Sequence, residues 1–122
     1  MYFEDTRDIV GPVSIQILVV PSKGSGPDSR GVIVGKIIGI ENPLQYRITI
    51  YAFTDLWYIQ PTHDQPLTMI NSDGTWESTT HLGSQYAVLL VKSSFKPLST
   101  IVTLPSGDDV LAFKIIGAKI SP

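Results

Sequence analysis

Glycine and proline interrupt this sequence so often that no long helix fits between them. The 122 residues include 10 Gly and 9 Pro, and the stretches between them are short and rich in Val, Ile, Thr and aromatic side chains. Such residues favour extended strands, and no stretch carries a convincing apolar stripe of helical period. Strand-like runs with turn signals roughly every 8–12 residues are typical of a β-sandwich or barrel. The pattern therefore predicts an all-β fold.

Nine segments have the composition of strands. They are VSIQILVV (13–20), GVIVGKIIGI (31–40), YRITIYAF (46–53), LWYIQ (56–60), LTMI (67–70), TWEST (75–79), QYAVLLVK (85–92), STIVTL (99–104) and DVLAFKIIGAKI (109–120). The 46–53 segment alternates between two faces, whereas 85–92 is apolar on both faces, as expected of a central strand. We expect a single immunoglobulin-like antiparallel β-sandwich of about seven to nine strands over residues 11–122, preceded by a leader or linker at 1–10.

Three local features refine this prediction. Gly35 and Gly39 lie inside a strand-like run, which indicates a bulge or the close approach of another backbone. Asn71-Ser72-Asp73-Gly74 predicts a β-turn that needs glycine at positive φ. The 109–120 segment has some helical character, but its Val, Phe and Ile content favours a strand.

Composition excludes several classes of function. The net charge is −2 and the nine Lys and Arg form no run, so we expect no nucleic-acid partner. The absence of cysteine rules out a disulfide framework, Cys-ligated zinc and a thiol nucleophile. The apolar stretches fall short of the roughly 20 residues that a membrane-spanning helix needs, so we expect no membrane insertion. No signal peptide is visible at the N-terminus.

Catalytic patterns are weak. There is no G-x-S-x-G elbow, and a Ser/His/Asp triad would have to be assembled by the fold. A pair of acids for glycoside hydrolysis would come from Asp55, Asp64, Asp73 and Glu77, but these lie in or beside turns, where acids are common for solvation. We therefore expect no enzyme.

Metal-binding patterns are also weak. His63, Asp64 and His81 have the chemistry of a facial metal triad, and Asp73 with carbonyls of the 71–74 turn has that of a calcium site. His and Asp are frequent in polar loops, and the turn explains its own residues. We therefore expect no metal and no other cofactor.

Aromatic residues beside turns are the remaining signal. In an extended strand Trp57 and Tyr58 point to opposite faces, so one is expected in the core and the other at the surface. Trp76 follows directly on a turn. Exposed rings stack on the C–H faces of sugars, and polar neighbours bond the hydroxyls. The candidate carbohydrate-binding residues are Trp57, Tyr58, Gln60, His63, Asp64, Trp76 and His81. The alternative is that the two tryptophans close the two ends of the sandwich core.

A set of short motifs carries a family resemblance. They are GKIIGI (35–40), YRITIYAF (46–53), WYIQP (57–61), DGTW (73–76), HLGSQYAVLLV (81–91) and FKP (95–97). Together they resemble small bacterial β-sandwich accessory modules, similar to carbohydrate-binding modules, of extracellular or cell-envelope proteins. Many of those proteins also carry polysaccharide-degrading catalytic domains. The resemblance covers about three-fifths of the chain, over residues 35–105.

The resemblance implies a carbohydrate-associated role, outside the cell or in the cell envelope, as part of a larger protein. We therefore expect a non-catalytic accessory module that holds a polysaccharide or oligosaccharide on exposed aromatic side chains. The alternative is a structural spacer or protein-interaction module with no ligand of its own, whose partner is a neighbouring protein domain.

Overall fold

The computed structural model of the chain describes residues 9–25, 28–62 and 64–119. Its elements are, in chain order, β1 (Ile9–Val19), β2 (Arg30–Ile40), the 3-10 helix η1 (Pro43–Gln45), β3 (Tyr46–Phe53), β4 (Trp57–Gln60), β5 (Thr68–Met69), β6 (Thr75–His81), β7 (Gln85–Lys92), β8 (Thr100–Ile101) and β9 (Val110–Gly117). The predicted all-β class is confirmed, with nine strands over the described ranges. β1 begins inside the range expected as a leader, and β8 is far shorter than predicted.

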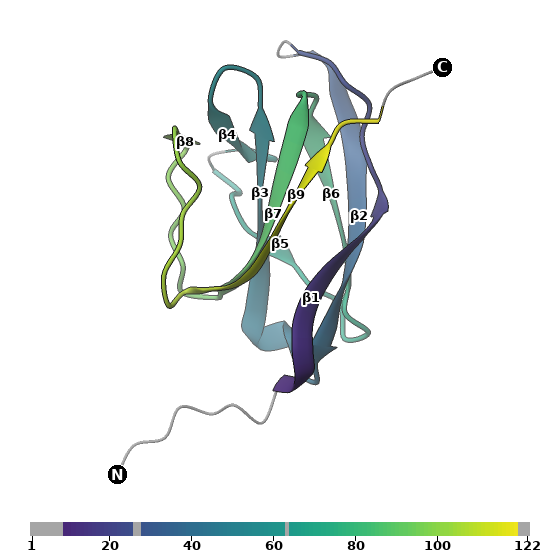
Figure 1. Ribbon diagram of the computed structural model, residues 1–122, viewed down its shortest axis with the longest axis vertical. Coiled ribbons are helices and arrows are strands. Elements are labelled where there is room, and N and C mark those ends of the chain that lie inside the picture. The colour runs from purple at the N-terminus through teal and green to yellow at the C-terminus, as the bar shows by residue number, and fades with distance from the viewer. Residues whose placement is uncertain (1–8, 26–27, 63, 120–122) are drawn as a thin grey trace.

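Two antiparallel sheets pack against each other as a sandwich. The smaller sheet has the order β1-β2-β6, and the larger has β8-β4-β3-β7-β9 with β5 paired to β3. Figure 1 shows β1 and β2 on one side of β3, β7 and β9, and the segment that carries β8 on the other side. Strands β3 and β7 are thus covered on both faces, and the sequence of β7 is accordingly apolar on both faces.

The space between the two sheets forms the inner core. Its buried residues are Ile15, Ile33, Ile37, Tyr46, Ile48, Ile50, Ala52, Ile70, Trp76, Tyr86, Val88 and Leu90. One face of β3 supplies four of them, as the alternation in its sequence predicts. Trp76 is the bulkiest fully buried side chain of the described chain, with only 1% of its surface exposed.

The opposite face of the larger sheet carries a second, outer core. Its buried residues are Tyr51, Trp57, Ile59, Ala87, Leu89 and Val91, and Phe53, Leu67, Phe95, Ile101, Leu104 and Val110 pack against them. Much of this cover comes from the largely irregular segment 93–110. The Tyr51 hydroxyl donates a hydrogen bond to the Leu98 carbonyl at 2.8 Å. The Ile59 N–H donates to the Ser99 carbonyl at 2.9 Å. These bonds fasten the segment over the sheet.

Two glycines admit close contacts in the smaller sheet, as expected. A Cβ on Gly35 would lie 2.3 Å from the Trp76 ring and 2.6 Å from the Gln16 carbonyl oxygen. The indole therefore occupies the space that a side chain would take. Gly39 has φ +92°, and a Cβ there would lie 2.4 Å from the Pro12 carbonyl oxygen. The register of β1 against β2 shifts beside Gly39, which marks a bulge or irregularity.

The 71–74 segment forms the predicted turn. Gly74 has φ +90°, and its N–H donates to the Asn71 carbonyl at 2.9 Å. The turn joins β5, which pairs in the larger sheet, to β6 in the smaller one. It therefore carries the chain from one layer to the other and sets the position of β6.

Candidate functional site

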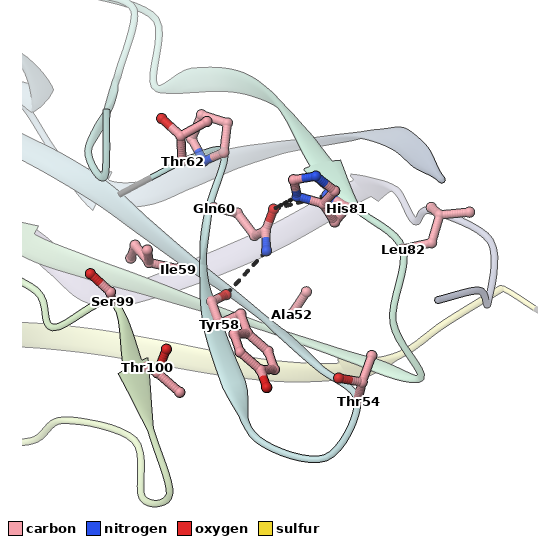
Figure 2. Close-up of a pocket in the computed structure, with 11 residues that line it drawn as sticks. Ala52, Thr54, Tyr58, Ile59, Gln60, Thr62, His81, Leu82, Ser99 and Thr100 are labelled. Carbon is pink, nitrogen blue, oxygen red and sulfur yellow. Dashed lines mark hydrogen bonds between the residues drawn. The ribbon is translucent and has the colours of Figure 1, made fainter. Parts of the chain in front are cut away.

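A pocket of about 600 Å³ opens where β6, an edge strand of the smaller sheet, faces β4 of the larger sheet. Ala52 pairs with Tyr58 across β3 and β4, and Ile50 pairs with Gln60. Paired residues share a face, so both β4 side chains lie on the same side as the inner core. Figure 2 shows them with His81 from the end of β6. The pocket is thus a side opening of the sandwich.

Tyr58 supplies the exposed aromatic ring of this pocket. Its side chain is 38% exposed, and its hydroxyl donates to Asp55 Oδ1 at 2.9 Å. That bond is the main reason why the pKa of Asp55 lies below its ordinary value, with help from the Thr54 hydroxyl. The same bond raises the pKa of Tyr58. Asp55 therefore holds the tip of a partly exposed ring that lines the pocket.

Gln60 links the two sheets behind the ring. It is 2% exposed. Its Oε1 accepts the backbone N–H of His81 at 2.8 Å and lies 3.2 Å from His81 Nδ1. Its Nε2 donates to the Tyr58 carbonyl at 3.2 Å. Both ends of the Gln60 amide thus bond to other groups of the protein, and the amide holds the His81 ring at the pocket wall.

Hydroxyl groups line the open side of the pocket. Thr54, Thr62, Ser99 and Thr100 line it and are exposed. Thr54 already donates to Asp55, and Thr62 Oγ1 accepts the N–H of Gln65 at 3.1 Å. None of the described lining residues is an Asp, Glu, Lys or Arg. The surface therefore offers one aromatic ring and several neutral donors and acceptors, which suits an uncharged ligand rich in hydroxyls.

Both tryptophans lie inside the protein instead of at the site. Trp76 is 1% exposed in the inner core, and Trp57 is 7% exposed in the outer core. The Trp57 ring packs on Phe53, with 5.0 Å between ring centroids. Neither indole has a face open to a ligand. Their burial corrects the expectation that these two rings stack on a glycan, since each ring faces apolar side chains of a core.

The other predicted residues divide into two groups. Tyr58, Gln60 and His81 come together at the pocket. Asp64 is exposed and does not line it, and His63 lies outside the described residues.

The acids and histidines in the described ranges do not assemble into a metal site. In those ranges no three His, Cys, Asp or Glu side chains gather closely enough to hold a metal ion. Asp73 Oδ1 accepts hydrogen bonds from the N–H and hydroxyl of Thr75, which closes the turn on itself. Those bonds lower the pKa of Asp73, the Thr75 hydroxyl contributing most.

Sequence reasoning missed the hydroxyl residues. Thr54 and Thr62 lie at the two ends of the β4 region, so their nearness to Tyr58 was a usable signal. Ser99 and Thr100 are about forty residues further along the chain. They reach the pocket only because β8 pairs with β4, with Tyr58 opposite Thr100. No local pattern in the sequence predicts that pairing.

Comparisons with family models, with curated protein sequences and with solved structures gave no match to this chain. In the described part of the chain, no helix has the length and apolar character that crossing a membrane requires. The chemistry of the pocket is therefore the main guide to function.

Proposed function

We propose that this chain is a non-catalytic module that binds neutral carbohydrate, with Tyr58 as the stacking ring of the pocket between β4 and β6. The observation that carries the proposal is the exposed Tyr58 ring, held by Asp55, beside a pocket wall of neutral hydroxyl side chains. A place outside the cell or in the cell envelope, as part of a larger protein, goes with this role.

Three physical features support a sugar ligand. A sugar ring has apolar C–H faces that pack on an aromatic ring, and its hydroxyls exchange hydrogen bonds with threonine, serine and histidine side chains. The lack of charged lining residues favours an uncharged glycan over an acidic one. The lining residues come from β4, the end of β6 and the β8 region at one side of the sandwich (Figure 2), where several of them are exposed to solvent.

The test is binding to four neutral polysaccharides: laminarin, xylan, galactomannan and hydroxyethyl cellulose. We expect at least one to retard the protein in affinity electrophoresis. Tyr58→Ala should weaken that binding by about tenfold or more, which corresponds to about 1.4 kcal/mol. Tyr58→Phe keeps the ring and should lose far less.

Phe113→Ala is the matched control. Phe113 is an aromatic residue that is 66% exposed on β9, away from the pocket, so its removal should not change binding. Binding by none of the four polysaccharides, or equal binding by wild type and Tyr58→Ala, would contradict the proposal.

We also propose an immunoglobulin-like topology for the sandwich. The sheets β1-β2-β6 and β4-β3-β7-β9 correspond to strand orders A-B-E and C′-C-F-G, with consecutive strands distributed as in that fold. Tyr86, near the start of β7, supports this. Its hydroxyl accepts the N–H of Gly83 at 3.0 Å and donates to the Ser22 carbonyl at 2.8 Å, which resembles the tyrosine corner of strand F.

A second candidate, a module that docks on a neighbouring domain, is favoured by one patch. Phe113 and Ile115 are 66% and 47% exposed on the outer face of β9, at the edge of the larger sheet. Hydroxyl-radical footprinting of this chain alone, and of a longer protein that contains it, tests this. Docking predicts strong labelling of Phe113 only in the isolated chain, and equal labelling in both would contradict it.

A further inference from the structure

We propose that Gln60 is a positioning residue that fixes the tautomer of His81, so that the imidazole offers its Nε2 lone pair to a ligand hydroxyl. The tautomer follows from hydrogen bonds inside the protein. The role of the ligand hydroxyl rests on the proposed carbohydrate-binding function.

Two backbone groups determine which way the Gln60 amide points. The His81 N–H lies 2.8 Å from one end of the amide, and this backbone group is always a donor. The Tyr58 carbonyl lies 3.2 Å from the other end, and it is always an acceptor. The oxygen must therefore face His81 and the NH₂ must face Tyr58. A flipped amide would place donor against donor and acceptor against acceptor.

The amide oxygen then determines the proton position on the imidazole. His81 Nδ1 lies 3.2 Å from Gln60 Oε1, which has no proton to give. A favourable contact therefore requires Nδ1–H. In the neutral ring the other nitrogen, Nε2, is then an acceptor. Because Gln60 is only 2% exposed, water has little access to replace this bond.

The acceptor is the ring nitrogen that Gln60 does not hold. Figure 2 shows the second ring nitrogen on the side of the imidazole away from Gln60, and His81 lines the pocket. An Nε2 lone pair accepts from an alcohol O–H and repels a carbonyl or carboxylate oxygen. The pocket would thus select a ligand with a free hydroxyl at this point.

The first experiment measures the imidazole ¹⁵N shifts of the ligand-free protein at a pH where the ring is neutral. The chain has two histidines, so His63→Gln leaves His81 as the single signal. We expect Nδ1–H to predominate. Gln60→Met should shift the population toward Nε2–H, while Gln60→Glu, which keeps an acceptor oxygen, should restore Nδ1–H. Predominant Nε2–H in the protein with Gln60, or no change in Gln60→Met, would overturn the inference.

The second experiment tests the ligand contact with whichever of the four polysaccharides binds, and with its O-methylated form. His81→Asn places an amide near the Nδ1 position and removes Nε2, so it should weaken binding about tenfold without loss of the folded state. Methylation should weaken binding to the wild type more than it weakens binding to His81→Asn, because contacts to the Thr and Ser hydroxyls are lost in both proteins. Equal loss on methylation in both proteins would overturn the role of Nε2.

The two experiments separate this inference from the proposed function. If none of the four polysaccharides binds, the carbohydrate role and the ligand contact both fall, and the NMR result still decides the tautomer. If a polysaccharide binds through Tyr58 but His81 carries its proton on Nε2, the carbohydrate role stands and this inference is wrong.

Discussion

The inner and outer cores lie on opposite faces of the larger sheet and are closed in different ways. The inner core is covered by a second sheet, whose strands satisfy one another's backbone hydrogen bonds by pairing along most of their length. The outer core is covered mainly by the segment 93–110, in which Thr100 and Ile101 join the larger sheet as β8 and Val110 begins β9. Its cover therefore depends on a few individual contacts, such as the bond from Tyr51 to Leu98.

The difference teaches where this fold is rigid and where it can open. A sheet opens only when many ladder bonds break together, whereas an irregular segment can detach locally at lower free energy. The candidate pocket lies between the paired sheets and the irregular covering segment. One wall comes from β4 and β6, which are each paired within their own sheet, and the other includes Ser99 and Thr100 of the covering segment. Four predictions test this comparison.

The largest expected effect is on the two tryptophans. Trp76→Ala should lower the free energy of unfolding by about 5 kcal/mol, and Trp57→Ala by about 3 kcal/mol, the two ends of the range for such truncations. Trp76 is enclosed between sheets that cannot collapse around the cavity, whereas the irregular cover of Trp57 can move inward. Urea unfolding followed by far-UV circular dichroism measures both. A larger loss for Trp57→Ala would break the comparison.

Gly35→Ala tests how closely the inner core is packed. The added methyl would lie 2.3 Å from the Trp76 ring and 2.6 Å from the Gln16 carbonyl oxygen. Relieving such contacts costs typically about 1–3 kcal/mol. Gly11→Ala is the control, because a Cβ there meets nothing within 4 Å. Denaturation midpoints of the two variants should therefore separate, and equal midpoints would show that the indole moves aside freely.

Tyr51→Phe tests how the outer core is fastened. The change removes the hydrogen bond to the Leu98 carbonyl and should lower the free energy of unfolding by about 1 kcal/mol. Amide hydrogen exchange should accelerate most in the 95–101 segment. The β2 amides should accelerate only as much as the lower free energy of global unfolding requires. Uniform acceleration across both sheets would mean that the covering segment opens only with the whole domain.

Alkaline pH should also destabilise the folded protein, and burial of Tyr51 sets the sign of this effect. Burial raises the pKa of Tyr51 from 10.0 to about 12. The folded state thus favours the neutral phenol, and this contribution to stability is complete below about 10.0 and is lost as pH rises toward 12. Urea midpoints measured across this interval should fall less steeply in Tyr51→Phe than in wild type. The slope will not vanish, because burial also raises the pKa of Tyr86.

The site was only partly predictable from the sequence. Alternation correctly placed Trp57 and Tyr58 on opposite faces, and the strand β4 brought Gln60 onto the same face as Tyr58. The sequence could not tell which of the two faces was open, because the larger sheet is covered on both sides. The burial of Trp76 was equally hard to predict. Its neighbours in the sequence do not indicate that Gly35, on the paired strand, leaves room for the indole.

By itself the sequence determined the secondary structure and the class of fold. Turn residues divide the chain into strands. Alternating side chains identify half-buried strands, and strands that are apolar on both faces are central. These features can be read from the sequence because they depend on residues that are near neighbours in the chain. Only the tertiary structure decided which rings are sealed and which residues meet at the pocket. Gln60 meets His81 across two sheets, and Tyr58 meets Thr100 through β8, because long-range pairing places them there.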